Sequence, residues 1–324
     1  AVTMLAQAPN GTFLAGGTNL VDLMRLGVAT PDVLVDVRRL TSDRIQELPD
    51  GGLRVGAAVP NSELAADRRV RRRYPVLSQA LLSGASGQLR NLATTGGNPL
   101  QRTRCVYFQD VTTPCNKREP GSGCSAVGGY TRYHAVLGVP AALPDTSAPE
   151  TCTATHPSDM AVAMAALDAV VHTHGSDGQR TIPLTGLYRM PSDAPERDTV
   201  LEHAELITAV DLPPLPLAAN SRYRKVRDRA SYAFALVSVA AALQVTDGQV
   251  RDVRLALGGM AHKPWRATTA EQALRGAPAT EASFRAAAEA ELAVARPLTG
   301  NAFKAPLARN VIASTLLELV EAAP

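Results

Sequence analysis

The chain contains four cysteines, and all of them lie in one window of the sequence. The spacing is Cys-x9-Cys-x8-Cys-x27-Cys, formed by Cys105, Cys115, Cys124 and Cys152. No C-x2-C pair occurs, whereas most structural zinc sites contain one, so the spacing disfavours zinc. A disulfide framework is typical of small secreted domains, and this chain has 324 residues and no visible signal peptide, which disfavours disulfides.

Four thiolates supply the ligand number of a [4Fe–4S] or a [2Fe–2S] cluster, although the spacing differs from that of bacterial ferredoxins. Nearby positive charges would lower the pKa of the thiols and offset the charge of a cluster. The basic residues around the cysteines are Arg102, Arg104, Lys117, Arg118 and Arg132. Gly121 and Gly123 would let the backbone approach the sulfurs closely. The residues therefore favour an iron–sulfur site, and zinc, a disulfide and four unliganded cysteines remain as alternatives.

Two glycine-rich turns could bind phosphate. "AGGTN" at 15–19 follows a short apolar strand and precedes a helical pattern, and "TTGGN" at 94–98 repeats the same residue types. Glycine lets the backbone approach a ligand, and N–H groups at such a turn can bind a phosphate. No Gly-Lys-Ser/Thr follows either turn, and neither is a dinucleotide G-x-G-x-x-G. Together the turns predict a diphosphate held between two lobes, with a plain structural turn as the alternative for each.

Periodicity predicts the elements that position these turns. A strand at 12–14, a helix from Leu20 and a strand at 33–40 form the first unit. A strand near Leu53, a helix capped by Asn61 or Ser62 and a helix over 76–92 form the second. Further predicted elements are a helix capped by Ser158 or Asp159 with an apolar face that includes Val171, a strand or helix at 232–245, a strand at 250–260, and helices at 280–295 and 303–322.

Composition excludes several functional classes. Hydrophobic residues make up 45% of the chain and charged residues 19%, which is typical of a globular protein. Aromatic residues are only 4% and the net charge is +3, so the sequence does not predict nucleic-acid binding. No run of 18 apolar residues occurs, so no membrane insertion is predicted.

Several other polar residues could carry chemistry, but each has a simpler interpretation. His156 is interpreted as a loop residue before a helix, and Asp159 either caps that helix or contacts the nucleotide. His172 and His174 form an H-x-H pair that could bind metal, although exposure at a strand end is the preferred interpretation. The basic run 68–74 is interpreted as a solvated helix face, with subunit docking as the alternative, and Trp265 as a packing residue.

Six stretches of the chain resemble the FAD-binding subunits of the xanthine dehydrogenase or molybdenum hydroxylase family, in the family order and from about residue 10 to 322. They are "FLAGGTNLVDLM", "GAAVPNSEL", "GASGQLRNLATTGGNPLQ", "THPSDMAVAMAALDA", "ELITAVDLP" and "YRKVRDRASYAFALVSVAAAL". The cysteine segment resembles one branch, the bacterial, periplasmic-type aromatic aldehyde oxidoreductases, whose FAD subunit also carries a [4Fe–4S] cluster. Shorter family members lack this insertion, and hydroxybenzoyl-CoA reductases space their cysteines differently.

The resemblance implies an α+β fold with two domains. Residues 1–215 would form a FAD-binding domain of the p-cresol methylhydroxylase type, with lobes at about 1–48 and 49–215 and the cysteine insertion at 102–153. Residues 216–324 would form an α+β domain like that of carbon monoxide dehydrogenase flavoproteins.

The resemblance also implies site residues. The FAD-binding positions are Thr12, Phe13, Leu14, Ala15, Gly16, Gly17, Thr18, Asn19, Leu20, Thr94, Gly97, Asn98, Ile207 and Lys225. The [4Fe–4S] ligands are Cys105, Cys115, Cys124 and Cys152, and no residue is expected to be catalytic.

The implied function is electron transfer within a heterotrimer. A large subunit would bind molybdopterin and oxidise an aldehyde, a small subunit would hold two [2Fe–2S] clusters, and this chain would pass electrons from FAD to an external acceptor. The heterotrimer could pair with a second copy, in the cytoplasm or, by co-export with a signal-bearing partner, in the periplasm. The alternatives are the FAD subunit of a related molybdenum hydroxylase or CoA-thioester reductase, and a stand-alone FAD reductase.

Overall fold

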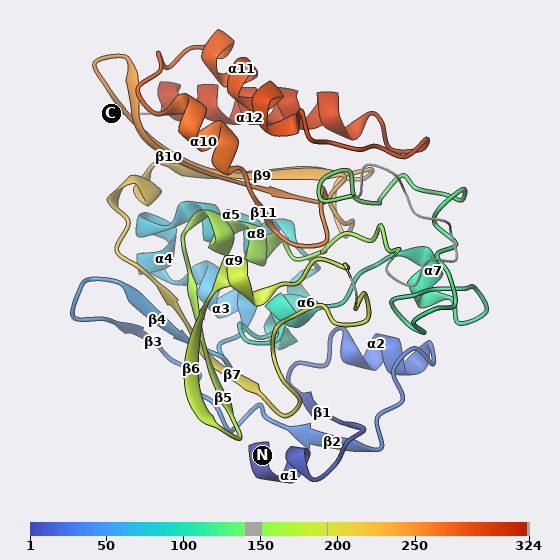
Figure 1. Cartoon of the computed structure of the whole chain (residues 1–324). Helices are drawn as coiled ribbons and strands as arrows, with labels where there is room; N and C mark the ends of the chain where they lie inside the picture. The colour runs from blue at the N-terminus through green and yellow to red at the C-terminus, as the bar shows by residue number, and fades with distance from the viewer. Residues whose placement is uncertain (140–150, 193, 323–324) are drawn as a thin grey trace.

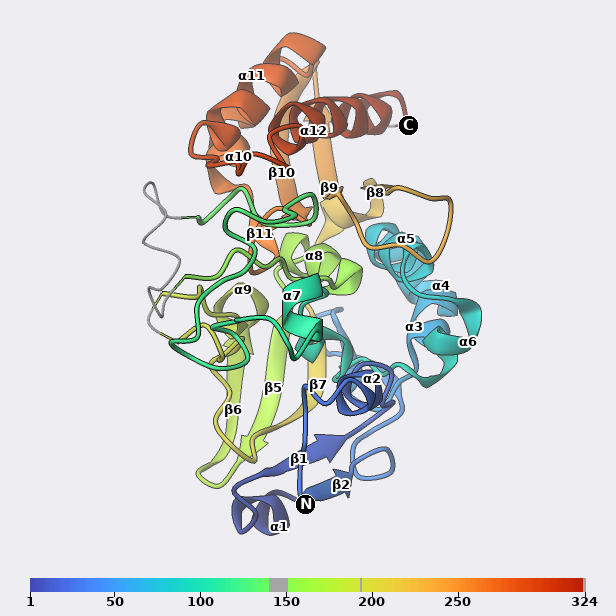
Figure 2. The same ribbon diagram turned by 90° about the vertical axis from the view of Figure 1, so that its right-hand side faces the viewer.

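The strands form three sheets in the part of the chain that the computed structural model describes, residues 1–139, 151–192 and 194–322. One face of the C-terminal sheet is covered by α10 (Thr268–Leu274), α11 (Glu281–Leu292) and α12 (Lys304–Glu321), as Figure 1 shows. Two further helices, α5 (Pro75–Ser83) and α8 (Asp159–Ala166), lie between that sheet and the central one. The N-terminal sheet lies at the opposite end of the molecule from α12 (Figure 2). Residues 140–150 of the predicted cysteine insertion lie outside the described residues.

The N-terminal sheet has two parallel strands, β1 (Gly11–Leu14) and β2 (Val33–Asp36). Helix α1 (Val2–Ala6) precedes β1, and α2 (Leu20–Arg25) connects the two strands. The predicted strand, glycine turn, helix and strand of this segment are confirmed. The loop Ala15–Asn19 therefore lies at the carboxyl end of a strand and directly before a helix.

The central sheet has five antiparallel strands in the order β3-β4-β7-β5-β6. They are β3 (Ile45–Glu47), β4 (Leu53–Gly56), β5 (Val170–Gly175), β6 (Gly178–Pro183) and β7 (Leu206–Leu212). Because β3 pairs with β4, it belongs to this sheet, although the predicted lobe boundary near residue 48 assigns it to the first lobe.

Short helices and turns lie in the connections between these strands and in the segment that follows β7. They are α3 (Asn61–Ala66), α4 (Arg68–Arg73), α5 (Pro75–Ser83), α6 (Gly87–Leu92), α7 (Val106–Gln109), α8 (Asp159–Ala166) and α9 (Leu184–Leu187), with 3-10 turns η1 (Asn98–Leu100) and η2 (Pro216–Ala219). Every residue of α8 is buried, because this helix packs between the central and C-terminal sheets. The α8 helix can be uniformly apolar for that reason.

The C-terminal sheet is antiparallel, in the order β11-β10-β9-β8. Its strands are β8 (Ser221–Val226), β9 (Val237–Thr246), β10 (Gln249–Gly258) and β11 (Trp265–Arg266), and its helices are α10 (Thr268–Leu274), α11 (Glu281–Leu292) and α12 (Lys304–Glu321). The first seven residues of β9 are buried, since α12 contacts one side of the sheet and α8 the other. The predicted helices at 280–295 and 303–322 and the α+β class are confirmed.

The structure corrects three local predictions and adds one helix. The helix predicted over 76–92 is two helices, because Gly84 is extended and Ser86 begins a new helix by accepting a hydrogen bond from the Leu89 N–H. Asn61 is the first residue of α3 and makes no side-chain cap. Val171 lies on β5 and not on a helix face. Helix α10 was not predicted.

Candidate functional site

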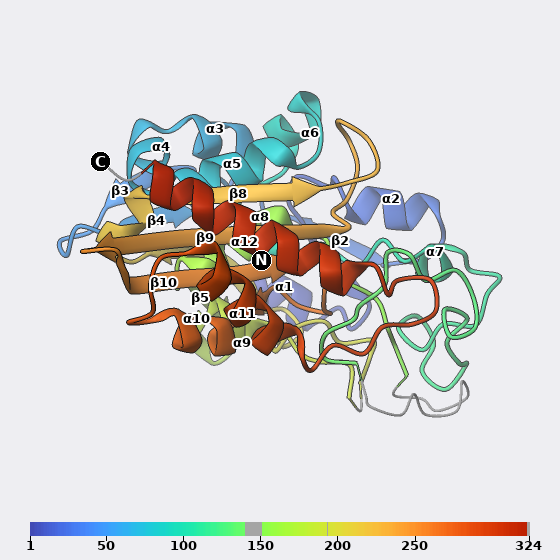
Figure 3. The same cartoon turned by 90° about the horizontal axis from the view of Figure 1, so that it is seen from above.

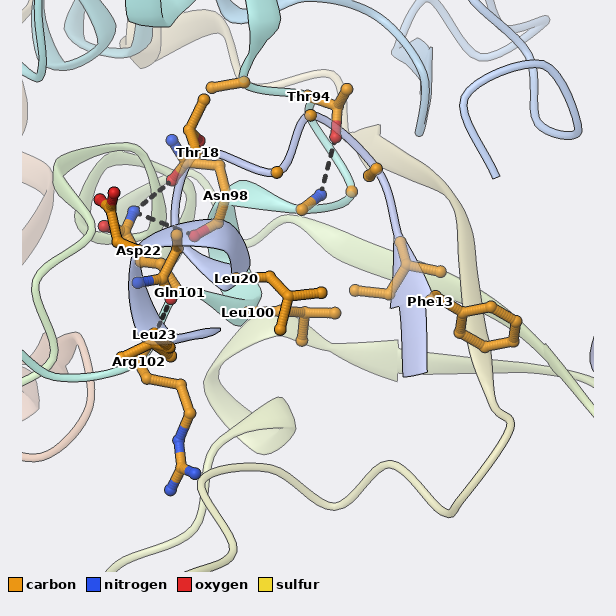
Figure 4. Close-up of a pocket in the computed structure, with 18 of the residues that line it drawn as sticks. Phe13, Thr18, Leu20, Asp22, Leu23, Thr94, Asn98, Leu100, Gln101 and Arg102 are labelled. Carbon is orange, nitrogen blue, oxygen red and sulfur yellow. Dashed lines mark hydrogen bonds between the residues drawn. The ribbon is translucent and has the colours of Figure 1, made fainter. Parts of the chain in front are cut away.

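A cleft of about 810 Å³ opens between the central sheet, β8 and the N-terminal unit, which comprises β1, α2 and β2. Figure 4 shows its polar side, where Thr18 and Asp22 of the N-terminal unit face Asn98 of the second glycine turn and Gln101, which follows that turn. Thirteen of the fourteen predicted FAD-binding residues line this cleft, and Leu14 does not. The structure therefore brings together segments that are separated by up to 213 positions, from Thr12 to Lys225.

The first glycine turn needs both of its glycines. A Cβ atom on Gly16 would lie 2.0 Å from the backbone oxygen of Leu92, and Gly17 has a φ of +70°. Both positions thus exclude other residues on steric grounds. Within the described residues, the backbone N–H groups of Gly16, Gly17, Thr18 and Asn19 donate to no protein acceptor. Free N–H groups at the rim of a cleft suit the oxygens of a diphosphate.

The second glycine turn is held by its own side chains. Thr94 Oγ1 accepts a hydrogen bond from the Gly97 N–H at 3.2 Å, and the Asn98 N–H donates to the Thr94 carbonyl at 2.9 Å. The Gln101 side-chain amide donates to the Asn98 Oδ1 at 3.2 Å. These bonds fix the shape of the second turn before any ligand binds.

A buried ion pair closes the opposite side of the cleft. The Lys225 ammonium lies 2.7 Å from Asp159 Oδ2 and also donates to the Ser83 carbonyl. Tyr223 donates its hydroxyl proton to Asp159 Oδ1 at 2.6 Å, and burial together with this carboxylate raises the pKa of Tyr223. Ser158, and not Asp159, caps α8 through the Ala161 N–H. Asp159 is therefore a cleft residue that fixes Lys225.

Arg102 connects the first glycine turn to the cysteine insertion, and sequence reasoning assigned it only a charge. Its backbone N–H donates to Asn19 Oδ1 at 2.7 Å, and its guanidinium binds Asp198 at 2.7 Å and lies over the Phe108 ring. Lys117 binds the other oxygen of Asp198 at 2.5 Å. Burial opposes ionisation of Asp198, but the charges of Arg102 and Lys117 outweigh it and lower its pKa to about 2.

The four cysteines line one small cavity in the insertion, and all four are free thiols. Cys115 and Cys124 face each other across an antiparallel bridge. Buried Asn116 shapes this loop, because its Oδ1 accepts hydrogen bonds from the Gly121 and Gly123 N–H groups, and its Nδ2 donates to the carbonyl of Thr151, next to Cys152. Sequence reasoning missed Asn116, since its partners are recognisable only in the folded loop.

The predicted lowering of the thiol pKa by basic residues is confirmed at Cys152, where Lys117 acts in that direction, but burial outweighs it there and is the largest influence at Cys105 and Cys124. Burial raises the pKa of Cys105 to about 11 and that of Cys152 to about 12, and it also raises the pKa of Cys124. Of the five basic residues, Lys117 partly offsets the effect at Cys152. The other four make contacts elsewhere: Arg118 with loop carbonyls, Arg132 with Asp228, Arg102 with Asp198 and Arg104 with the Arg102 carbonyl.

Buried polar atoms without hydrogen-bond partners gather around the same cavity. Within the described ranges, they include Thr151 Oγ1, Thr153 Oγ1 and His134 Nδ1, all in residues that line the cavity. The other ring nitrogen of His134 lies 3.1 Å from Cys105 Sγ. Among the same residues, no three histidine, cysteine, aspartate or glutamate side chains form a group that could hold a single metal ion.

The remaining candidates have structural roles. His156 is a buried loop residue whose Nε2 lies 3.1 Å from the Pro99 carbonyl. His172 is half-buried and binds Asp211, whereas His174 is exposed. Trp265 packs on the C-terminal core and donates its indole N–H to Glu291. Arg71 and Arg72 of the basic run are exposed on α4.

Comparison with known families gives two adjoining matches. Residues 1–215 match the FAD binding domain in molybdopterin dehydrogenase, and residues 221–319 match the CO dehydrogenase flavoprotein C-terminal domain. Solved structures share the fold. Quinoline 2-oxidoreductase from Pseudomonas putida 86 has a TM-score of 0.73 at 23% identity, and the match covers 99% of this chain and 93% of the chain in that structure. CO dehydrogenase from Oligotropha carboxidovorans has a TM-score of 0.74 at 20% identity, and the match covers 99% of this chain and 94% of the chain in that structure.

Curated relatives are similar over nearly the whole chain. The aldehyde oxidoreductase FAD-binding subunit PaoB of Escherichia coli (strain K12) is 54% identical over 314 residues, which cover 96% of this chain and 92% of the relative. The carbon monoxide dehydrogenase medium chain of Hydrogenophaga pseudoflava is 24% identical, and the match covers 98% of this chain and 92% of the relative. The chain therefore belongs to the FAD-binding subunits of the xanthine dehydrogenase and molybdenum hydroxylase family of oxidoreductases.

Proposed function

We propose that this chain is the FAD- and [4Fe–4S]-binding electron-transfer subunit of a heterotrimeric molybdenum-containing aldehyde oxidoreductase. The observation that carries the aldehyde assignment is the 54% identity, over 96% of this chain, to a subunit of an aldehyde oxidoreductase. A large molybdopterin subunit and a small subunit with two [2Fe–2S] clusters would supply the electrons, and an external acceptor would remove them.

The cleft suits FAD on three grounds. The free N–H groups of the turn Ala15–Asn19 would bind the diphosphate, with Thr94, Gly97 and Asn98 on its other side. Ile207 and the fixed ammonium of Lys225 would position the flavin ring. Bound flavin exchanges one or two electrons, and the protein's part is to hold it and to exclude water.

The cysteine cavity suits an iron–sulfur cluster better than a single metal ion. Each iron of a [4Fe–4S] cluster takes one cysteine thiolate, so the four sulfurs lie farther apart than the ligands of one ion. Such spacing agrees with four cysteines around one cavity that offers no single-ion site in the described residues. The unpartnered Thr151, Thr153 and His134 atoms would then face the sulfurs of the cluster, since buried polar groups are normally hydrogen-bonded.

No helix among the described residues is long and apolar enough to cross a membrane. We propose that the complex acts in the cytoplasm, or in the periplasm if a partner subunit carries the export signal.

The test is to co-express the chain with its neighbouring open reading frames and to analyse the purified complex. We expect three different subunits, one FAD and four iron atoms per copy of this chain beyond those of the small subunit, and flavin absorbance that bleaches when an aromatic aldehyde is added without oxygen. Flavin without the additional iron would contradict the cluster. A single-chain reductase that turns over unaided would support the stand-alone alternative, and reduction by a purine or a CoA thioester would support a related family enzyme.

A further inference from the structure

A second cavity, of about 320 Å³, adjoins the FAD cleft on the side of the cysteine insertion. The two hollows share part of their lining, including Arg104, Asp159, Tyr232 and Phe234. A ligand in this cavity would therefore be a direct neighbour of a flavin in the cleft. The volume lies at the lower end of the range for small-molecule sites, so it fits one small ring system.

The walls of this cavity contain all the exposed aromatic side chains of the described residues. The chain has one Trp, seven Tyr and five Phe, and only four of these residues are exposed. They are Tyr130, Tyr133, Tyr232 and Phe234, with exposed fractions of 53%, 37%, 59% and 43%. Each of the four lines the cavity. In a chain so poor in aromatic residues, this clustering indicates a surface that stacks on a planar ring.

The two aromatic walls are held together. Tyr130 and Tyr133 belong to the cysteine insertion, and Tyr232 and Phe234 to the loop between β8 and β9, and both segments extend beyond the same end of the C-terminal sheet (Figure 3). Asp228 of that loop binds the Arg132 guanidinium at 2.6 Å and accepts a hydrogen bond from the Tyr133 hydroxyl at 2.5 Å. Tyr232 has a φ of +53°, a strained conformation for a tyrosine that is typical of functional sites.

Arg104 supplies a hydrogen-bond donor at the boundary of the two hollows. Its guanidinium lies over the Phe234 ring at 5.0 Å and donates to the Arg102 carbonyl. No carboxylate in the described ranges forms an ion pair with it, and burial lowers its pKa to about 10. A guanidinium with free N–H groups can bind the carbonyl oxygen of a ligand.

The glycines of this cavity argue against a dinucleotide. A Cβ on Gly259 would lie 2.7 Å from the Ala235 oxygen, and a Cβ on Gly258 would lie 2.3 Å from Ser238 Oγ. Close packing within the protein therefore accounts for both glycines, and they do not form a phosphate-binding turn.

We propose that this cavity, which we call the aromatic pocket, binds the terminal electron acceptor, and that the acceptor is a planar quinone. The proposal rests on FAD binding in the neighbouring cleft. Tyr130 and Phe234 stack on the ring, and Arg104 donates to a quinone oxygen. In the balanced reaction, one aldehyde and one water give one carboxylic acid, while the quinone takes up the two electrons and two protons and leaves as the hydroquinone.

The test uses the assembled complex with 1,4-naphthoquinone as the probe and the Tyr130→Ala variant. Equilibrium dialysis measures the Kd of the quinone directly, and turnover with naphthoquinone is compared with turnover with ferricyanide, which needs no aromatic site. Loss of one stacked ring should raise both Kd and KM for naphthoquinone about two- to tenfold and leave the ferricyanide rate unchanged. Leu40→Ala, an exposed apolar residue outside the pocket, is the matched control and should change neither value.

Two results would overturn the proposal. One is an unchanged Kd in both Tyr130→Ala and the double variant Tyr130→Ala/Phe234→Ala. The other is quinone binding to the isolated full chain but not to the complex, which would mean that a partner subunit covers the pocket. Flavin content and its anaerobic bleaching by aldehyde are measured first, and a failure there would instead contradict the proposed function.

Discussion

The FAD cleft and the cysteine insertion are neighbours, but their interiors differ. Contacts within the protein hold the cleft. Thr94 accepts a hydrogen bond from the Gly97 N–H, Asn19 accepts one from the Arg102 N–H, and Lys225 forms an ion pair with Asp159. The insertion surrounds its cavity with four thiols, three of which have a pKa raised by burial, and with polar atoms that have no partner in the described residues. Leu23 of α2 packs against Phe108 and Cys115, so the two regions share one small apolar cluster.

This difference predicts that the cleft and the insertion depend to different degrees on FAD and on the proposed cluster. Hydrogen bonds and an ion pair within the protein hold the walls of the cleft without a ligand, although the N–H groups at its rim have no protein acceptor, whereas several unsatisfied buried groups in one loop destabilise that loop unless something binds them. We therefore expect the insertion to need its cluster for order and the FAD cleft to form without FAD.

The largest effect is expected for Cys152→Ser. Loss of one ligand should remove nearly all of the iron assigned to the insertion, and the loop should become sensitive to limited proteolysis, while FAD content stays close to that of the wild type. Iron analysis, flavin absorbance and trypsin digestion measure the three outcomes. Val111→Ala, an exposed position in the same loop, is the control. Loss of FAD together with iron would show that the cleft also depends on the cluster.

The contrast between the two regions also explains which features the sequence predicts. The turn at Ala15–Asn19 is a local signal, because the strand, the glycines and the helix are consecutive, and the structure has all three. The helix break at Gly84 is also local, but the apolar residues on both sides obscured it. The contacts of the insertion are not local: Arg132 binds Asp228, which lies 96 residues away, and buried Lys304 donates to the carbonyl of His134. The periodicity of a sequence carries no information on side-chain pairs between distant segments. The sequence therefore predicted that basic residues lie near the cysteines, but not which groups those basic residues bind.

The second effect concerns the closed side of the cleft. Lys225→Met leaves Asp159 buried without its partner, which costs about 3–5 kcal/mol of stability. We expect the apparent Tm to fall on the order of 10 °C, measured by scanning calorimetry without FAD. Arg38→Met, which removes an exposed ion pair with Asp36, is the control and should change the Tm by less than about 1 °C. An equal Tm for both variants would contradict a cleft that is held by its own contacts.

The third effect concerns the close contact of the first glycine turn. Gly16→Ala forces the turn away from the Leu92 backbone, and overpacking of this kind costs about 1–3 kcal/mol, so FAD affinity should fall about 10- to 100-fold. Iron content should stay unchanged, which makes this variant the reciprocal of Cys152→Ser. Gly87→Ala has no atom within 4 Å of the added methyl group and should bind FAD normally. Titration of the apoprotein with FAD, followed by fluorescence, measures the difference.

The smallest effect is a pH dependence at His156, which lies between the second glycine turn and α8. Burial lowers the pKa of His156 to about 4, so the folded protein holds a neutral ring where the unfolded chain, with a pKa of 6.5, takes up a proton. The free energy of unfolding that depends on the neutral His156 ring is therefore at its full value above pH 6.5 and decreases as the pH falls toward 4. Between pH 7.5 and 5.5 this costs about 1 kcal/mol. His156→Gln removes the titrating group, so the apparent Tm of the variant should fall less than that of the wild type over the same interval.

The control for this pH dependence is the comparison of the two proteins with each other. His134 and His262 have pKa values shifted in the same direction and are present in both proteins, so the difference between the two Tm changes isolates His156. Parallel Tm curves for the two proteins would mean that the ring is already protonated, or exposed, in the folded state.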